Sequence, residues 1–229
     1  MSEKDVNFVE EYNFKIENCV GSANLGAPLN LQELYKRLLK LQSELQDDFS
    51  KGRKAGNDLI GTGEDWPFIV RHQPREFPGL ILKLRLNVRA SLLIFSSGNL
   101  VITGAKSKEE LDKVAKIVVD LLNKCDFKIE KIPEIQLQNI VASADLGKPI
   151  NLELVASLAG EYAHYEPEIF PGLIFKMVRP KVVLLLFRSG KIVCTGAKSR
   201  EMIIEALWKI DEMLRDFDAY VEGEELEYF

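Results

Sequence analysis

The hydrophobic and polar positions of this 229-residue chain change their period several times, in the same order in each half. Alternation over residues 15–23 and 136–144 predicts two short strands. Each strand is followed by a glycine-containing turn and an amphipathic helix, for which Asn30 and Asn151 are suitable N-caps. The chain therefore begins each half with a strand and a helix.

Runs rich in Val, Ile, Leu and Phe follow in each half. In the second half Pro171-Gly172, Arg179-Pro180 and Ser189-Gly190 interrupt them, which predicts a meander of antiparallel strands. A closing helix is predicted over 108–124 and again over 200–217, because apolar residues form one stripe along each segment. The expected fold class is α+β, with the helices on one face of the sheet.

The two halves are copies of one unit. The segment IFSSGNLVITGAKS at 94–107 matches LFRSGKIVCTGAKS at 186–199. Likewise, KIENCVGSANLGAPLNL matches LQNIVASADLGKPINL, and REFPGLILKLRL matches PEIFPGLIFKMV. A long repeat present twice indicates a pseudo-symmetric duplication rather than a solenoid. The predicted division is a first repeat over 1–125 with an insertion at about 36–73, a second repeat over 126–219 and an acidic tail over 220–229.

The insertion extends the first helix, because apolar residues keep helical spacing at Leu31, Leu34, Leu38, Leu41, Leu45 and Phe49. Beyond Lys51, several glycines and then Trp66-Pro67-Phe68 predict a flexible loop with an aromatic anchor. Three roles are open for the insertion: a packed accessory helix, a site for a partner, or a part in DNA binding. Its positive and negative charges nearly balance, so it is not an obvious DNA-binding arm.

Composition narrows the possible functions. With 46% hydrophobic residues and a mean hydropathy of −0.06, the chain is typical of a core-forming protein, and neither a membrane-spanning run nor a signal peptide is present. Three widely spaced cysteines and two histidines predict neither a disulfide framework nor a zinc site. We expect an intracellular protein that is not an enzyme, has no cofactor or metal, and uses no membrane or small-molecule substrate. An alternative is a nucleic-acid-processing enzyme. The sequence argues against it, because it contains neither clustered carboxylates nor a Cys/His pair.

The predicted strands are apolar on both faces. Side chains two residues apart share a face, and one set contains Asn and Thr at matching positions, whereas the opposite set is uniformly apolar and can supply the core alone. The first set comprises Asn18, Val20, Leu93, Val101 and Thr103, then Asn139, Val141, Leu185, Val193 and Thr195. Any one Val or Leu of this set can alternatively face the helices. If helices cover one face, a ligand or partner must cover the other.

The duplicated motifs, among them QNIV, EPEIFPG and the SGKIVCTGAK series, resemble the core of the TATA-box-binding protein family over residues 14–219, apart from the insertion. The resemblance implies a pseudo-twofold saddle of two β-α-β4-α repeats, a curved antiparallel sheet with helices on its convex face. Its concave underside binds double-stranded promoter DNA through the minor groove and bends it. That geometry is carried over from the family, which is itself the standard example of it.

The resemblance also assigns roles to residues. The set of valines, leucines, asparagines and threonines described above would form the minor-groove floor, and two phenylalanine pairs, Phe77 with Phe95 and Phe170 with Phe187, would intercalate at the end base steps. Asn99 stands where the second repeat has Lys191. The phosphate contacts implied are Lys83, Arg85, Lys106, Lys176, Arg179, Lys181, Lys191 and Lys198.

Partners are implied by the same resemblance. The stretch YEPEIF resembles the acidic edge that the family offers to transcription factor IIB or its archaeal counterpart TFB, through Glu166, Glu168 and Ile169, and RNA polymerase would be engaged indirectly. The alternative for this stretch is a solvated acidic turn. Acidic residues in the first closing helix leave a factor IIA contact open. The acidic ending and a pI near 5.3 favour an archaeal member. Such a member would act at the cytoplasmic nucleoid, and a eukaryotic one in the nucleus.

The sequence therefore predicts a general transcription initiation factor that binds and bends A/T-rich promoter DNA and nucleates preinitiation complex assembly. The alternative is a divergent paralogue that acts mainly as a protein-interaction hub with weak TATA specificity.

Overall fold

The computed structural model describes residues 12–50, 68–85 and 88–221. The chain divides into two compact units. One contains residues 18–138, and the other contains the segment before residue 18 together with the chain from residue 139 onward. Each unit is described by itself.

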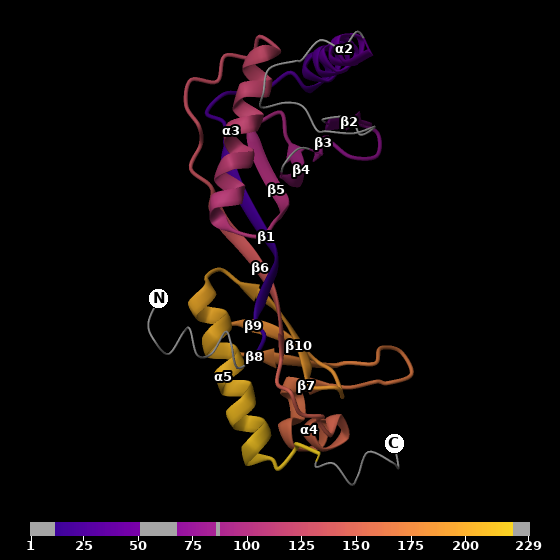
Figure 1. The fold of residues 1–229 in the computed structure, drawn as a ribbon, viewed down its shortest axis with the longest axis vertical. Helices are drawn as coiled ribbons and strands as arrows, with labels where there is room; N and C mark the ends of the chain where they lie inside the picture. The colour runs from indigo at the N-terminus through magenta and orange to yellow at the C-terminus, as the bar shows by residue number, and fades with distance from the viewer. Residues whose placement is uncertain (1–11, 51–67, 86–87, 222–229) are drawn as a thin grey trace. The chain divides into compact units, whose positions relative to one another are not determined.

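The unit of residues 18–138 contains a five-stranded antiparallel sheet in the order β2-β3-β4-β5-β1 (Figure 1). Along the chain its elements are β1 (Lys15–Asn24), α2 (Leu31–Ser50), β2 (Phe68–His72), β3 (Leu80–Arg85), β4 (Arg89–Ile94), β5 (Asn99–Ala105) and α3 (Lys108–Lys124).

The other unit repeats this plan with strands in the order β6-β10-β9-β8-β7. Its elements are β6 (Gln136–Asp145), α4 (Leu152–Ala159), the single-turn helix η1 (Gly160–Tyr162), β7 (Ala163–His164), β8 (Leu173–Met177), β9 (Val182–Leu186), β10 (Lys191–Ala197) and α5 (Arg200–Asp216). The predicted α+β class and the β-α-β4-α order are confirmed. The second closing helix ends one residue earlier than predicted, with Phe217 as its C-cap.

The helices begin where the sequence places good N-caps. The Oδ1 atoms of Asn30 and Asn151 accept hydrogen bonds from the third residue of each helix at 3.0 Å. Ser107 and Ser199, the last residues of the duplicated motif, cap α3 and α5 through their hydroxyls. Of the helices that the structure describes, none combines the length and apolar character needed to cross a membrane.

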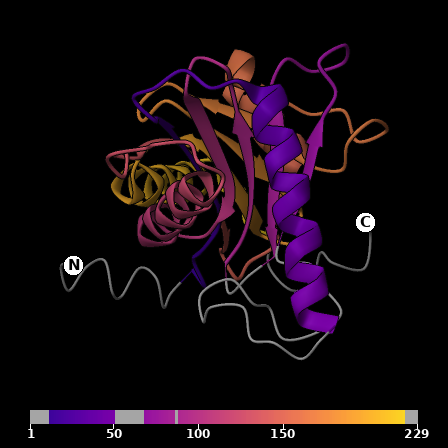
Figure 2. The ribbon, with the colours of Figure 1, turned by 90° about the horizontal axis from the view of Figure 1, so that it is seen from above.

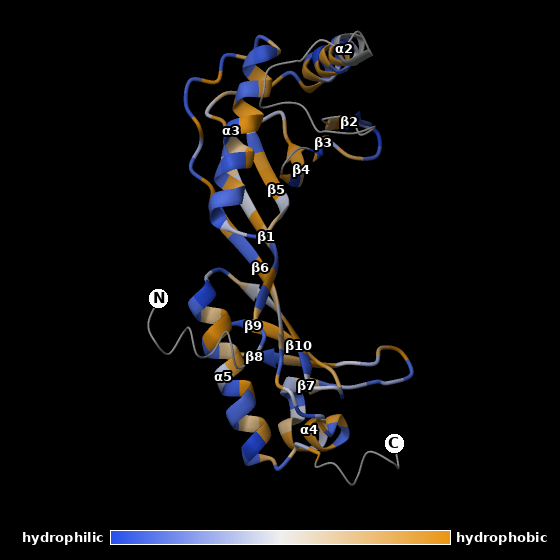
Figure 3. Cartoon of the chain, viewed as in Figure 1, coloured by the Kyte–Doolittle hydropathy of each residue, from blue (hydrophilic) through white to orange (hydrophobic). Residues whose placement is uncertain are grey.

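The core of each unit lies between the sheet and its closing helix. In α3 the whole predicted stripe is at most 1% exposed: Leu111, Val114, Ala115, Val118, Leu121 and Leu122. Figure 3 shows β4 and β5 mainly in the hydrophobic colour, whereas α3 carries hydrophilic residues on its outer side. Each Å² of apolar surface removed from water stabilises the fold by about 25 cal/mol, so burial in this layer is the main stabilising contribution of the unit.

The insertion contains more regular structure than predicted. Phe68 was expected in a loop, but it begins β2, lies opposite Leu84 and is 1% exposed, so that expectation was wrong. Trp66 and Pro67 lie outside the described residues, as does the side chain of Phe49. Within the described part, Leu34 and Leu38 of α2 are fully buried, and Gln42 donates to the Phe68 carbonyl at 3.2 Å. Figure 2 shows α2 lying along the sheet of its unit, which agrees with a packed accessory helix.

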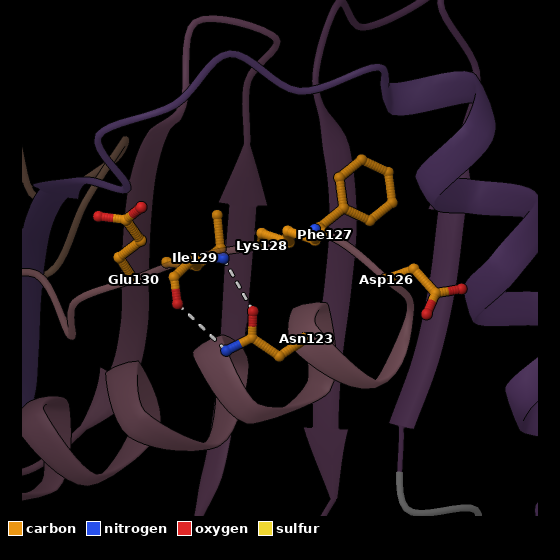
Figure 4. Close-up of a pocket in the computed structure, with 6 residues that line it drawn as sticks. All are labelled: Asn123, Asp126, Phe127, Lys128, Ile129 and Glu130. Carbon is orange, nitrogen blue, oxygen red and sulfur yellow. Dashed lines mark hydrogen bonds between the residues drawn. The ribbon is translucent and has the colours of Figure 1, made fainter.

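The Asn123 side chain of α3 bonds to the segment that follows this helix (Figure 4). The Asn123 amide donates to the Ile129 carbonyl at 3.2 Å and accepts from the Ile129 N–H at 2.8 Å. Beside it, Arg37 of α2 donates to the Cys125 carbonyl and lies 5.5 Å from the Phe127 ring centre. The hollow lined by Asn123, Phe127 and Ile129 therefore lies beside the contact that this segment makes with α2.

Candidate nucleic-acid interface

The two faces of each sheet differ in burial as the alternation predicts. All ten predicted floor residues are partly exposed. The opposite set is at most 3% exposed and lies under the helices: Cys19, Ile94, Leu100 and Ile102, then Ile140, Leu184, Leu186, Ile192 and Cys194. Burial also raises the pKa of the Cys194 thiol to about 12, so it stays neutral beneath the floor. The prediction of two distinct faces is confirmed.

The strand register adds residues to the partly exposed face. Leu93 lies opposite Val101, and Leu185 lies opposite Val193. Three further residues, which the sequence reasoning did not select, continue these rows: Ile81 opposite Leu93, Ile174 opposite Leu185, and Val183 opposite Thr195. Each of the three lies two residues before a selected residue, Lys83, Lys176 or Leu185, and therefore on the same sheet face, which is the signal that could have identified it. The apolar floor is therefore wider than predicted.

A β-bulge shapes the floor in each unit. Between the pairs Cys19–Ala105 and Gly21–Ile102, Thr103 and Gly104 oppose one residue of β1. Gly104 has φ +99°, a conformation that suits glycine, and its N–H donates to Asn18 Oδ1 at 2.8 Å. The other unit repeats this bulge at Thr195 and Gly196, whose N–H donates to Asn139 Oδ1 at 2.7 Å. The recurring Thr-Gly-Ala sequence is thus the bulge that holds each asparagine.

This bond orients the asparagine amides. Because Oδ1 accepts from a glycine N–H, Nδ2 is the donor end, and it lies 3.3 Å from the hydroxyl of Thr103 in one unit and of Thr195 in the other. The second N–H of each amide has no partner among the residues that the structure describes. Each unit therefore presents an oriented donor within an apolar floor.

Each predicted phenylalanine pair is assembled. The ring centres of Phe77 and Phe95 are 5.8 Å apart at an interplanar angle of 63°, and those of Phe170 and Phe187 are 5.9 Å apart at 66°. Such edge-to-face contacts contribute about 0.5–1.5 kcal/mol each. All four side chains remain partly exposed. Each pair is therefore a preassembled apolar cluster that the core of its own unit does not fully cover.

The eight predicted phosphate contacts are all exposed. Arg89, which sequence reasoning omitted, lies opposite Arg85 in the register and lines a hollow together with Lys83. It corresponds to Lys181, and the extra residue in the first β3–β4 turn concealed this match. The cations therefore border the floor at strand ends.

The acidic segment lies in the turn before β8. Ile169 is 80% exposed, Glu166 and Glu168 are exposed, and the Glu166 carboxylate is 3.3 Å from His164 Nε2. The backbone N–H groups of residues 169 and 170 both donate to the Glu166 carbonyl. The equivalent turn of the other unit has the same bonds to the Gln73 carbonyl. The two turns thus share a backbone and differ in charge.

The chain is similar to known proteins over most of its length. The family model described as "Transcription factor TFIID (or TATA-binding protein, TBP)" matches residues 65–125 and 134–217. A TATA-box-binding protein of Pyrobaculum aerophilum is 41% identical over 219 residues, covering 94% of this chain and 94% of the relative. One of Methanothermobacter thermautotrophicus is 44% identical over 191 residues, covering 83% and 88%.

Among solved structures, the Methanococcus jannaschii TBP matches with a TM-score of 0.69 and 37% identity, covering 89% of this chain and 98% of that chain. The first family match starts after most of the insertion, which agrees with a repeat interrupted there. The chain belongs to the TATA-binding protein family.

Proposed function

We propose that this chain is a general transcription initiation factor of archaeal type that binds A/T-rich promoter DNA in the minor groove and bends it. The observation that carries this proposal is that each unit has a partly exposed floor and, beside it, a partly exposed phenylalanine pair. Relatives named TATA-box-binding protein support it, and none supports the alternative of a hub with weak TATA specificity. We place the protein at the nucleoid.

The floor suits A·T base pairs. In the minor groove A·T and T·A expose only acceptors, whereas G·C adds a projecting amino donor. Valine and leucine side chains cannot accept a hydrogen bond from that amino group, so a G·C pair leaves it unsatisfied. The oriented amides of Asn18 and Asn139 donate to adenine N3 or thymine O2. Selectivity for A·T pairs follows.

The phenylalanine pairs are the bending wedges. Opening a base step costs a few kcal/mol, which an inserted ring must recover through contact with the bases and through the wider groove. A pair held edge to face is already ordered, so little side-chain entropy is lost on insertion. The exposed lysines and arginines, with Arg89 added to the predicted eight, then neutralise the phosphates of the bent duplex.

The turn at Glu166 to Phe170 is the proposed contact for transcription factor B. Its exposed Ile169 can enter an apolar pocket, and its two carboxylates suit basic side chains around that pocket. RNA polymerase would then be recruited through that factor. The other unit has Gln73, Arg75 and Glu76 at the corresponding positions and lacks this combination.

Selection of binding sites from random duplexes tests the DNA assignment. The protein alone is expected to enrich A/T-rich sites, and adding transcription factor B should lengthen the consensus without creating it. A consensus that appears only with the factor would instead support the hub.

The factor contact has a matched control. Glu168→Arg is expected to weaken the ternary complex with transcription factor B at least about tenfold, by placing like charges at the contact, and to leave DNA binding alone intact. Arg75→Glu, at the same position of the first turn, should leave the ternary complex unchanged. Equal effects from the two substitutions would contradict the assignment.

A further inference from the structure

The outward side of α5 carries one continuous stripe of exposed residues. Their spacing places them within one face of the helix, opposite the buried residues Ile203, Leu207, Ile210 and Leu214. We call this face the outer stripe: Glu201, Glu205, Trp208, Glu212 and Asp216, all exposed. In Figure 1 α5 lies along the sheet of its unit and contacts β10, so its outer side is the side away from that sheet.

Trp208 lies at the centre of the outer stripe and is 53% exposed. Scattered single apolar residues are normal on protein surfaces, so exposure alone assigns nothing. Tryptophan is nevertheless the largest side chain and is enriched among the residues that dominate protein interfaces. Its indole also binds a cationic group over its face better than any other side chain does.

The charge around Trp208 is acidic. Two cations beside the stripe form ion pairs with carboxylates of the same helix, Lys209 with Glu205 at 2.5 Å and Arg215 with Asp211 at 2.9 Å. Glu212 forms no ion pair within the described part of the chain, and neither does Asp216. A tryptophan beside two carboxylates without ion pairs in the described chain, Glu212 and Asp216, is complementary to a segment that combines positive charge with an apolar anchor.

The other unit shows that packing does not require this surface. α3 occupies the same place in its repeat, buries the same stripe and carries Glu109, Lys113, Lys116, Asp120 and Lys124 on its outer side. Lys116 stands where α5 has Trp208, and the face of α3 is of mixed charge. The outer stripe is therefore a property of one repeat only.

We infer that the outer stripe of α5 is a docking surface for a lysine- and arginine-rich segment of a partner protein, with Trp208 as its central contact. The stripe and the floor lie on opposite sides of the same unit, so the segment can bind while DNA occupies the floor. Its acidity repels DNA and leaves a basic protein segment as the favoured occupant. A second copy of this chain could offer positive charge mainly through the cations that border its floor, and DNA occupies those cations, so a partner protein is the favoured occupant.

The test uses a synthetic peptide in which lysine and arginine flank leucine, and a control peptide with glutamate at every basic position. Trp66→Phe leaves Trp208 as the sole tryptophan, so its fluorescence reports binding. The basic peptide is expected to bind and change the Trp208 emission, with affinity that falls as salt rises. No binding, or equal binding of the acidic control, would overturn the proposal.

Substitutions distinguish binding at the outer stripe from nonspecific attraction of a basic peptide to an acidic protein. Trp208→Lys and Glu212→Lys are each expected to weaken peptide binding about tenfold or more, while Lys113→Ala on α3 leaves it unchanged. DNA affinity measured on the same proteins should stay at the wild-type value, so failure here is distinct from failure of the DNA assignment. Equal losses from the α3 and α5 substitutions would contradict the inference.

The partner class is tested in cells of the source organism. A photo-cross-linking amino acid at position 208 is expected to capture segments rich in lysine and arginine, and the same group at position 116 should not. Captured segments without that excess would overturn the assignment. Sedimentation of the purified protein tests a second copy as the occupant. Self-association that is lost in Trp208→Lys would identify that second copy and overturn the proposal.

Discussion

The two units agree closely on one sheet face and differ over the rest of their surfaces. The asparagine bonds to the bulge glycines measure 2.8 and 2.7 Å, and the phenylalanine pairs differ by 0.1 Å in separation. A face kept alike in two copies suits a ligand that is itself nearly two-fold symmetric. Duplex DNA is such a ligand, since its backbone and minor-groove acceptors repeat in both directions.

The surfaces that differ suit partners without that symmetry. Trp208 replaces Lys116, the acidic turn at Glu166 replaces a turn with Gln73, and α2 is 20 residues long where α4 has 8. Each occurs once in the chain. A protein partner that recognises one of these features contacts only one of the two units, which gives a DNA binder built from two similar units a direction.

The largest expected effect comes from the shared amides. Asn18→Asp and Asn139→Asp keep the acceptor for the glycine N–H but replace the outward donor with a negative charge. DNA affinity should fall about 10- to 100-fold per substitution, because an anion then faces groove acceptors. Fluorescence anisotropy with an A/T-rich duplex measures this.

Asn123→Asp is the matched control, since it makes the same change in the hollow beside α3 and should leave DNA binding intact. If either floor substitution behaves like this control, the asparagine in that unit does not contact the groove.

A buried cluster distinguishes the second unit. Asp211, 6% exposed, accepts hydrogen bonds from Tyr12, Tyr220 and Arg215, whereas α3 has the buried Val119 at that position. Burial alone would raise the pKa of the Asp211 carboxyl, but these hydrogen bonds outweigh it and hold that pKa below its usual value. The ionised form is therefore favoured in the folded state.

Asp211→Asn should lower the free energy of unfolding at neutral pH by about 2 kcal/mol, because it weakens these bonds. A carboxyl with a depressed folded pKa stabilises above its unfolded pKa of about 3.9 and loses that contribution as pH falls toward the folded pKa. The gap between wild type and variant should therefore narrow below about pH 4. Urea unfolding across pH measures it, with the exposed Asp216→Asn as control. A gap independent of pH would contradict the role of the charge.

The smallest effect concerns one phosphate contact. Asn99→Lys copies Lys191 into the first unit and should raise DNA affinity a few-fold. The slope of log affinity against log salt should steepen by about 0.9 for the added contact. Lys191→Asn should change both quantities in the opposite direction. If neither substitution changes the salt slope, residues 99 and 191 at the starts of β5 and β10 do not contact phosphates.

Much of this organisation follows from the sequence, because strand alternation and helix stripes are local patterns. The caps Asn30 and Asn151, the closing helices to within one residue and the two sheet faces are predicted from the sequence. The bulges are not, because a bulge is defined by the register with another strand. Phe68 was misassigned because its strand is short and adjoins a glycine-rich stretch.

Long-range contacts escape sequence reasoning for the same reason. The hydrogen bond of Tyr12 to Asp211 joins residues 199 positions apart, and no local pattern marks either partner. Arg89 was missed because one added residue shifts the first β3–β4 turn relative to its copy. Internal repeats therefore predict the structure that the two copies share well, and they predict least where the two copies have diverged.

DNA bending tests the central claim most directly. Energy transfer between dyes at the two ends of an A/T-rich duplex would be measured with wild type, Phe77→Ala/Phe95→Ala, Phe170→Ala/Phe187→Ala and all four substitutions combined. Each double variant should lose about half of the bend and the quadruple variant should lose it all, while thermal unfolding confirms that each remains folded. A full bend that survives the quadruple substitution would contradict the account.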